Sequence, residues 1–373
     1  MKYYPLIWLL LLGVISCNKE KKEEIIYTAF TGARIINGTG SSPIEDGVLL
    51  VQDEQIVAVG SREEVEIPNQ TTIRELSGKT IIPGLINGHG HVGDVKGIEG
   101  GHYSSENLME NLSIYAKYGI TTVVSLGGDQ EDAVSFRHVN NKSTLDRSRL
   151  FIAGAVITGD TPEEAVEMVD QNHKMGVDFM KIRVDDNLGN STKMSEAIYR
   201  AVIDRSHELG YKIATHMYYL EDAKKLLEAG SDLIAHSVRD LPVDDEFVQM
   251  MKDKDIGYCP TLTRELSTFV YEDTAAFFSD PFFQKVYDGE TIQPLMDSER
   301  QAKVAADKNG QTYKEQLPTA YANLKTLNDA GVPIVFGTDS GVPTRFMGYF
   351  EHVEMEMMAE AGMSPMEILV SAT

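Results

Sequence analysis

A glycine followed directly by an apolar strand recurs along most of this 373-residue chain, and this repeat most constrains its fold. Each glycine ends a helical pattern, at the position where a left-handed backbone closes a helix. A helix start is marked as well, by Thr161-Pro162-Glu163-Glu164, which combines an N-cap, a first-turn proline and a capping-box glutamate. The junctions are Gly119 before 120–126, Gly176 before 177–184, Gly210 before 211–215, Gly230 before 231–235 and Gly331 before 332–336.

This alternation of helix and strand predicts a parallel α/β domain. Further strands are expected at 80–86, 150–157 and 256–261, which brings the total to eight. Eight parallel strands joined by helices favour a (β/α)8 TIM barrel, whose active site lies at the carboxyl ends of the strands. A doubly wound open sheet is the alternative, but no Gly-x-Gly-x-x-Gly motif follows an early strand to favour it.

Two regions differ from this repeat. Residues 25–80 consist of short apolar strands and turns, which predicts a small β-sandwich domain ahead of a barrel domain at 81–373. Residues 262–318 form a long polar and aromatic insertion. We weigh two roles for this insertion equally: helical packing on the barrel rim, or a lid over the active site.

The N-terminal segment predicts export. Residues 3–15 are apolar, too short to span a bilayer, and lead into Val14-Ile15-Ser16-Cys17. This segment, 1–17, resembles the signal peptide and lipobox of bacterial lipoproteins, in which the cysteine carries lipid. An ordinary secretory signal with an incidental cysteine is the alternative. With 18–24 as a polar tether, we expect a lipoprotein of the bacterial cell envelope, periplasm-facing or in the outer membrane.

The charge balance excludes one class of partner. With 34 basic and 57 acidic residues the net charge is -23, which argues against nucleic acid or an anionic membrane surface. Membrane contact is therefore expected only through a lipid on Cys17. The second of the two cysteines, Cys259, then has no disulfide partner, and we expect it to be a buried small side chain.

Four histidines stand where predicted strands end. His89 and His91 close Pro83-Gly84-Leu85-Ile86-Asn87-Gly88-His89-Gly90-His91, and side chains at i and i+2 on extended chain point the same way. His216 and His236 end two successive later strands. A single such histidine is usually a satisfied polar group. Two of them after a histidine pair predict a divalent metal site, with zinc as the expected ion.

Two further residues have ligand chemistry in similar positions. Asp339, in Gly337-Thr338-Asp339-Ser340-Gly341, either caps a helix or both ligates metal and exchanges a proton. Lys181 lies within strand 177–184, where a buried cation is unfavourable. It either pairs with an acid such as Asp178 or Asp185, or reacts with CO₂ to give a carbamate, an anionic donor that can bridge two metals.

Together these residues resemble the amidohydrolase superfamily of metal-dependent barrel hydrolases. The resemblance implies a first metal on His89, His91 and Asp339, a second on His216 and His236, and carboxylated Lys181 between them, thus two metals per chain. Within the superfamily the chain is most similar to the imidazolonepropionase-related branch, which includes zinc-dependent prolidase-type dipeptidases.

The sequence departs from this family in two places. Asn87 stands where the family usually has aspartate before the histidine pair, which alters the support of these ligands. In relatives the segment at 371–373 leads into another helix and into returning strands of the sandwich. The C-terminal part is therefore expected to be missing and the β-sandwich at 25–80 to be incomplete.

These features predict a metal-dependent hydrolase that cleaves an amide or peptide C–N bond, with a prolidase-like dipeptidase as the leading hypothesis. Bound metals would lower the pKa of a water to roughly 7 and present hydroxide. Asp339 would pass the proton to the leaving nitrogen, and His236 would help to stabilise the oxyanion. The alternatives are a cyclic amide or lactone hydrolase and a non-catalytic surface lipoprotein that serves as a binding module.

The substrate is expected to be a small molecule or a short peptide. Tyr218 follows His216 closely, Arg239 follows His236, and both are candidates to hold a substrate carboxylate, as is Arg264. Otherwise the tyrosine packs on the rim and the arginines pair with neighbouring acids. The oligomeric state, a homo-oligomer included, stays open.

Overall fold

A computed structural model of the chain describes residues 26–140, 142 and 144–373. The predicted signal segment, the tether and Cys17 lie outside the described residues. The chain divides into two compact units, one containing residues up to 35 with 43–81, and the other 36–42 with 82–373.

The first unit is a mixed β-sheet with the strand order β3-β2-β1-β4, in which β5 also pairs with β1. Strands β1, β2 and β3 are antiparallel neighbours, whereas β4 and β5 run parallel to β1. The strands are β1 (Tyr27–Ile35), β2 (Ile44–Gln52), β3 (Gln55–Ser61), β4 (Thr72–Glu75) and β5 (Thr80–Ile81).

The N-terminal β-rich region is thus confirmed; its described strands form one sheet, and the incomplete β-sandwich stays a prediction. A small cluster of Ala29, Val48 and Leu50 is buried. Ile56 is 64% exposed and Ile73 53% exposed. A sheet that is covered on one face only leaves the apolar side chains of its other face in contact with water.

The second unit contains parallel strands in two ladders, in the orders β6-β7-β8 and β12-β11-β10-β9. Isolated parallel bridges from Ile157 to Ile182, Tyr258 to Ile334 and Gly90 to Ser340 add further pairings. The strands are β6 (Leu85–Gly90), β7 (Ile120–Ser125), β8 (Arg149–Ile152), β9 (Met180–Val184), β10 (Ile213–Met217), β11 (Leu233–Ala235) and β12 (Gly257–Cys259).

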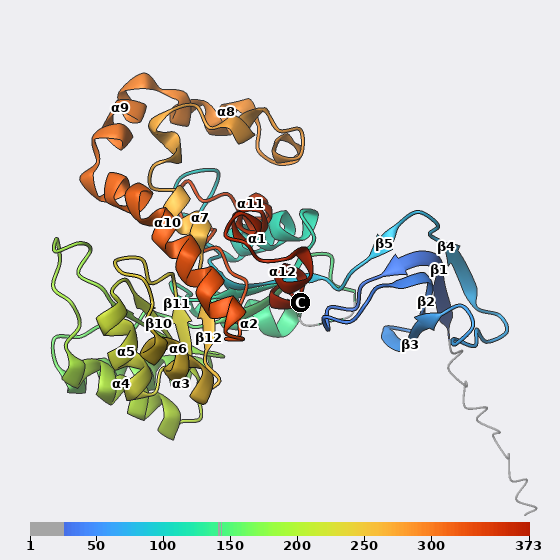
Figure 1. The fold of residues 1–373 in the computed structure, drawn as a ribbon, viewed down its shortest axis with the longest axis horizontal. Helices are drawn as coiled ribbons and strands as arrows, with labels where there is room; N and C mark the ends of the chain where they lie inside the picture. The colour runs from blue at the N-terminus through green and yellow to red at the C-terminus, as the bar shows by residue number, and fades with distance from the viewer. Residues whose placement is uncertain (1–25, 141, 143) are drawn as a thin grey trace, which may run out of the picture. The chain divides into compact units, whose positions relative to one another are not determined.

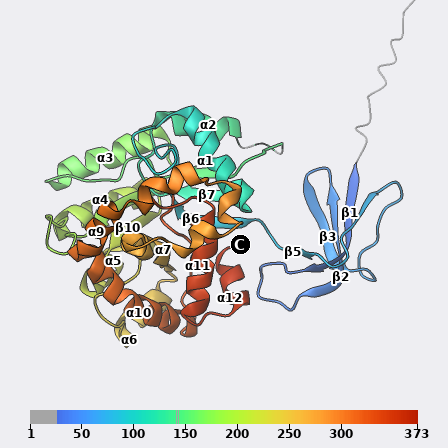
Figure 2. The ribbon, with the colours of Figure 1, turned by 90° about the horizontal axis from the view of Figure 1, so that it is seen from above.

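A parallel α/β architecture is therefore confirmed. The strand predicted at 332–336 is replaced by a single bridge at Ile334, so a closed barrel of eight strands stays a prediction. Figures 1 and 2 show the helices on the outside of the parallel strands. The helices of this layer are α1 (Ser105–Lys117), α2 (Glu131–Asn140), α3 (Pro162–Met175), α4 (Glu196–Glu208), α5 (Leu220–Ala229), α6 (Asp245–Asp253), α11 (Tyr349–Glu360) and α12 (Pro365–Ser371).

The predicted helix ends are confirmed where local chemistry sets them. Thr161 is the N-cap of α3 and accepts a hydrogen bond from the backbone nitrogen of Glu164. Gly176 ends α3 with φ 82°, and Gly230 ends α5 with φ 103°, both left-handed. The apolar faces of these helices pack on the strands in one core, which includes Val169, Ile182, Ile213, Leu226 and Phe247.

The insertion at 262–318 is mostly helical, and its aromatic side chains are packed. Tyr271, Phe278 and Phe283 are buried with Phe346 and Phe350 in one cluster. This agrees with the packing alternative for these aromatics, while a lid role stays a prediction. The region contains α7 (Leu262–Leu266), 3-10 turns at Val270–Glu272, Ala276–Ser279, Phe283–Lys285 and Gln293–Met296, α8 (Gly289–Ile292), α9 (Ser298–Ala306) and the start of α10 (Lys308–Asp329).

Within the part of the chain that the structure describes, no helix has both the length and the apolar character needed to cross a bilayer.

Candidate metal centre

The segment 336–340 lies along the end of β6 and brings Asp339 to the histidine pair. Backbone hydrogen bonds join the two segments: Gly88 donates to Phe336 at 2.8 Å, Asp339 donates to His89 at 2.6 Å, and His91 donates to Ser340 at 2.8 Å. These backbone bonds fix the aspartate beside the histidines.

Two glycines make this close approach possible. A Cβ atom on Gly337 would lie 2.8 Å from Cβ of His89 and 2.6 Å from Sγ of Cys259. A Cβ atom on Gly341, whose φ is 87°, would collide with the carbonyl oxygen of His91. Any side chain at these positions would push the aspartate segment away from β6.

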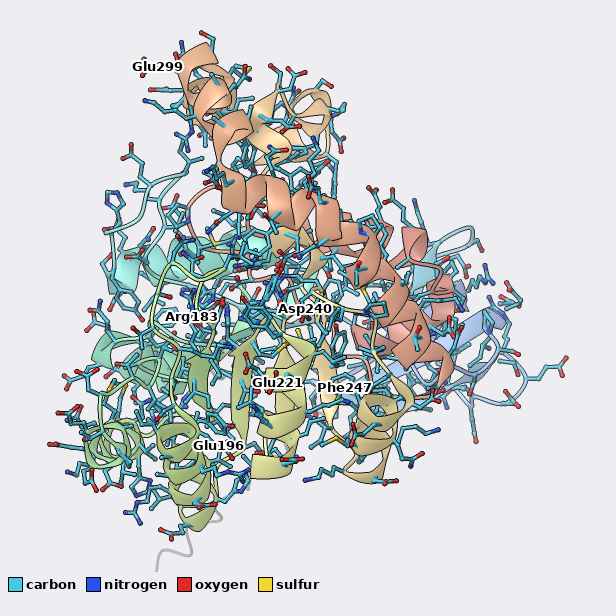
Figure 3. All side chains as sticks on the ribbon, turned by 60° about the vertical axis from the view of Figure 1, so that its left-hand side comes forward. Arg183, Glu196, Glu221, Asp240, Phe247 and Glu299 are labelled. Atoms are coloured by element: carbon cyan, nitrogen blue, oxygen red, sulfur yellow. The ribbon has the colours of Figure 1, made fainter. Side chains whose placement is uncertain are left out.

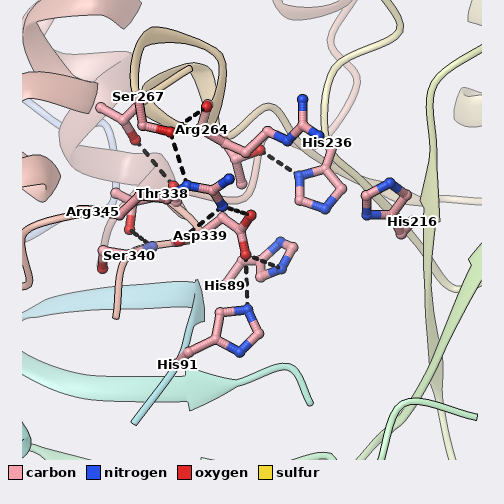
Figure 4. A network of polar contacts seen from close by, with 12 residues as sticks. His89, His91, His216, His236, Arg264, Ser267, Thr338, Asp339, Ser340 and Arg345 are labelled. Atoms are coloured by element: carbon pink, nitrogen blue, oxygen red, sulfur yellow. Dashed lines mark hydrogen bonds and ion pairs between the residues drawn. The ribbon is translucent and has the colours of Figure 1, made fainter. Parts of the chain in front are cut away.

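His89, His91 and Asp339 have the geometry of a metal-ligand group. Oδ1 of Asp339 lies 3.4 Å from Nε2 of His89 and 2.8 Å from Nε2 of His91. The ligand atoms of all three lie within 4.8 Å of one another (Figure 4). Two imidazole nitrogens and a carboxylate oxygen at such distances suit a divalent ion such as zinc.

The three other predicted ligands lie around the same pocket. The ring centroid of His236 is 4.6 Å from that of His89 and 4.3 Å from that of His216. Nζ of Lys181, in β9, lies 3.4 Å from Nε2 of His89. All six predicted ligands line a pocket of about 340 Å³. The structure thus brings the whole predicted set together.

Hydrogen bonds to the surrounding protein orient three of the four histidine rings. In each of these rings one nitrogen bonds to the surrounding protein, which leaves the other nitrogen available to a metal. The bonds are His91 Nδ1 with the oxygen of Gly127 at 2.9 Å, His216 Nε2 with Oδ2 of Asp185 at 2.9 Å, and His236 Nδ1 with Oγ1 of Thr261 at 2.7 Å.

Three residues at this site have a left-handed backbone. His236 has φ 86°, Asp339 has φ 58° and Thr261 has φ 48°. A left-handed conformation costs a residue with a side chain about 1–2 kcal/mol, and such residues cluster at functional sites. Aspartate and histidine adopt positive φ more often than most residue types with a side chain, whereas threonine does not.

Burial sets the protonation states of the ligands. It lowers the pKa of His89 and His236 well below the usual value and that of His216 to about 3, although the bond to Asp185 opposes the last shift. Burial raises the pKa of Asp339, but Arg345 together with the neighbouring histidines outweighs burial and holds this pKa well below its usual range. Neutral imidazoles and an ionised carboxylate are the forms that bind metal.

Lys181 has neither of the acidic partners considered for it. Asp178 is paired with Arg137 at 2.5 Å, and Asp185 accepts from His216. Burial lowers the pKa of Lys181 to about 8, so a sizeable fraction of the amine is neutral near physiological pH.

A buried carboxylate behind the ligands ties the two segments together. Oε1 of Glu351, in α11, accepts from Nδ2 of Asn87 at 2.6 Å, Oγ1 of Thr338 at 2.8 Å and Oγ of Ser340 at 2.5 Å. Asn87 also accepts from the backbone nitrogen of His89 at 2.9 Å. The amide of Asn87 can donate to Glu351, whereas a carboxylate at this position would repel it. Sequence reasoning missed Glu351 because helical periodicity alone does not mark it.

The predicted substrate residues are placed differently from what we expected. Arg239 is fully buried, and its Nε lies 3.1 Å from Oε1 of Glu265. The hydroxyl of Tyr218, also buried, donates to Gln316. Neither residue lines the pocket, because each is held by a partner behind it.

Other arginines reach the pocket. Arg264 lines it together with Arg183 and Arg345. Figure 3 labels Arg183 near the end of β9. Arg345, which sequence reasoning did not select, donates to Oδ2 of Asp339 and, through Nε, to Oγ of Ser267 at 2.9 Å (Figure 4).

Comparison with known proteins agrees with this geometry. Residues 80–373 match the model of the Amidohydrolase family. The chain therefore belongs to this family, which has an α/β fold.

Individual relatives are distant. An enamidase from Eubacterium barkeri is 25% identical over 198 residues, 49% of this chain and 47% of the enamidase. An uncharacterized protein of Mycobacterium tuberculosis is 21% identical over 71% of this chain and 65% of its own length. The matched part of the chain thus spans about half to two thirds of these curated relatives.

Two solved structures have similar folds. A Xaa-Pro dipeptidase with bound methionine in its active site gives a TM-score of 0.71 at 21% identity, over 93% of this chain and 87% of that one. A putative prolidase from Bifidobacterium longum gives 0.71 at 24% identity, over 93% and 82%. At these identities the likeness shows the fold.

Proposed function

We propose that this chain is a metal-dependent hydrolase that cleaves the C–N bond of an amide or peptide, with a closed (β/α)8 barrel as its scaffold. The observation that carries the proposal is the meeting of His89, His91 and Asp339 with two further histidines and Lys181 around one pocket. Family membership and the folds of the prolidase-like neighbours support the same reaction class.

The donor set fits two divalent ions, with zinc preferred because imidazole nitrogens predominate. His89, His91 and Asp339 would hold one ion, and His216 with His236 the other. Lys181 would bridge them as a carbamate, since its amine forms no ion pair with an acid among the described residues and is partly neutral. When bound, such metals polarise a carbonyl group and lower the pKa of a water to about 7.

The residues of the chain have distinct tasks in this reaction. Asp339 accepts a proton from water through its carboxylate and returns it to the leaving nitrogen. Arg345 orients that carboxylate by donating to Oδ2. His236, whose Nδ1 is bonded to Thr261, presents Nε2 toward the pocket and would help to stabilise charge on the carbonyl oxygen through the ion that this nitrogen would hold.

The leading hypothesis for the reaction is cleavage of a dipeptide, which the name of the dipeptidase neighbour suggests. Hydrolysis of a cyclic amide or lactone is the alternative hypothesis. The complete ligand set and the relatives do not favour a non-catalytic binding module.

Metal analysis of the purified full-length protein tests the proposal. We expect close to two metals per chain, fewer in Lys181→Ala, and no turnover by a folded Asp339→Asn variant. One metal that is insensitive to Lys181 would support the cyclic-amide alternative. A folded protein without metal would contradict the proposal.

We also propose that the protein is exported and anchored to the cell envelope through lipid on Cys17. This rests on the sequence of residues 1–17 alone. Labelled palmitate should enter the wild type and not Cys17→Ser, which should leave the membrane fraction. Equal labelling of both would contradict the anchor.

A further inference from the structure

The pocket that holds the predicted ligands has a cationic wall. Arg183, Arg264 and Arg345 all line it. Among the described residues of this lining, Asp339 is the single acid, and it is both a predicted metal ligand and the partner of Arg345. In a chain with a net charge of -23, this local excess of positive charge is unusual.

Two of the three arginines have a carboxylate of their own, but Arg264 shares one. Arg345 pairs with Asp339, and Arg183 lies 3.4 Å from Asp185. Nη1 of Arg264 lies 2.8 Å from Oε2 of Glu265, whose other oxygen is 3.1 Å from Nε of Arg239.

The shared carboxylate leaves a buried positive charge. Arg239 and Glu265 are fully buried and Arg264 is 8% exposed, so two guanidinium groups face one carboxylate away from water. An unbalanced buried charge is unfavourable. Because Arg264 lines the pocket and Arg239 does not, a bound anion would restore the balance at Arg264.

The ring of Tyr313 holds Arg264 in place. Its Cζ lies 4.5 Å from the centroid of the Tyr313 ring, and Cζ of Arg239 lies 5.2 Å from the same centroid. Stacked guanidinium groups keep a defined plane and bind carboxylates through paired hydrogen bonds. Figure 4 shows Arg264 beside His236, so an anion on Arg264 would lie next to the predicted ligands.

The same wall disfavours an ammonium group. A free dipeptide carries one beside its scissile bond, and here it would face arginines with no uncommitted acid on the described lining. Like charges brought together in a partly desolvated pocket select against such a ligand.

We infer that the substrate is an amide that carries a carboxylate, bound by Arg264, and no ammonium group; an N-acylated amino acid is its simplest form. This rests on the proposed hydrolase function and narrows its substrate class. Water adds across the amide: oxygen bonds to the acyl carbon, the C–N bond breaks, and the nitrogen takes up a proton.

Four isosteric probes separate the effect of the substrate carboxylate from that of the ammonium group. N-propionyl-L-phenylalanine and glycyl-L-phenylalanine differ by a methyl in place of an ammonium, and each has a neutral counterpart in its C-terminal amide. We expect the propionyl acid to be hydrolysed with a kcat/KM at least about 10-fold above the other three, in line with one charged hydrogen bond. The same four probes with proline or alanine in place of phenylalanine control for the side chain of the C-terminal residue.

Variants of Arg264 test whether this residue binds the substrate carboxylate. Arg264→Gln should raise KM for the propionyl acid about 10- to 100-fold and change the values for its amide less than about 3-fold. Arg264→Lys should recover part of the loss. Arg200→Gln, in the exposed part of α4, is the matched control and should behave as wild type.

A binding measurement does not depend on turnover. The propionyl acid should raise the thermal midpoint of the wild type and of Arg200→Gln, but not that of Arg264→Gln. The variant should stay folded, because Glu265 then faces Arg239 alone.

The outcomes separate the inference from the proposed function. Hydrolysis of glycyl-phenylalanine in preference to the propionyl acid would overturn the inference and leave a dipeptidase, with Asp160 in the adjoining hollow as a candidate partner for the ammonium. Equal effects of Arg264→Gln on acid and amide would also overturn it. If no probe is hydrolysed, the thermal shift still decides whether a carboxylate binds Arg264, while the hydrolase proposal fails for these amides.

Discussion

At the scale of single residues, the groups that support the ligands are as informative as the ligands themselves. Glu351 receives three hydrogen bonds on Oε1, while Oε2 has no partner among the described residues. Its removal would take an acceptor from three buried donors, of which Asn87 and Ser340 each keep one other partner. This arrangement implies that one acceptor oxygen, and not the negative charge, holds the end of β6 against the segment of Asp339.

Glu351→Leu should therefore lower the free energy of unfolding by about 2–4 kcal/mol and weaken metal binding, because buried donors lose their acceptor. Glu351→Gln keeps an oxygen at the Oε1 position and should cost less than about 1 kcal/mol. Urea unfolding and metal titration of both variants check this. Similar losses in the two variants would show that the charge matters.

Glu354 should make stability depend on pH. Burial raises its pKa to about 7 from 4.5, although Leu262 and Thr263 donate backbone hydrogen bonds to it at 2.7 Å. Its contribution is fully present below pH 4.5, because both states are then protonated, and is lost as pH rises to about 7. The loss is on the order of 3 kcal/mol.

Glu354→Gln should remove that part of the pH dependence. The comparison is the slope of unfolding free energy between pH 4.5 and 7 in wild type and variant, measured by urea unfolding. The variant will be less stable overall, because an amide cannot accept from both backbone nitrogens. An unchanged slope would mean that Glu354 does not titrate in this range.

At the scale of elements, helix ends follow from local chemistry. The N-cap at Thr161 and the left-handed glycines at Gly176 and Gly230 were predictable because each satisfies backbone groups within a few residues. Strand lengths were less predictable. Residues 332–336 resemble a strand in composition but make a single bridge, because pairing depends on neighbours distant in sequence.

Thr161→Ala should lower the free energy of unfolding by about 1 kcal/mol, because the backbone nitrogen of Glu164 loses its acceptor at the start of α3. Thr161→Ser keeps the hydroxyl and is the matched control. Chemical denaturation of the three proteins measures the effect, and equal losses in both variants would exclude the cap as its cause.

At the scale of the whole molecule, the predicted ligands all belong to the larger unit and come from separate strand ends. A metal that binds only the folded arrangement should therefore stabilise this unit by mass action. The small β-rich unit contributes no predicted ligand.

Removal of metal by a chelator should lower the thermal midpoint of the protein. At a free metal concentration of 100 times the dissociation constant, the stabilisation is about 2.7 kcal/mol. A His89→Ala, His91→Ala double variant, which keeps only the ligands of the second ion, should show a smaller shift with the chelator. Calorimetry with and without metal measures both, and an unshifted wild-type transition would contradict a structural contribution of the metal.

The sequence by itself determined the parallel α/β class, the helix caps and the candidate ligands at the strand ends. These depend on periodicity and on contacts within a few residues, and parallel strands bring their carboxyl ends to one side. Family resemblance added the grouping of His89, His91 and Asp339 into one site.

Only the tertiary structure decided which residues serve these ligands. Asn87 meets Glu351 across 264 positions of sequence, and Arg264, not Arg239, faces the pocket. Such contacts depend on how distant segments pack. No local pattern encodes them, because the same side chain can face a pocket or a buried partner according to what lies opposite.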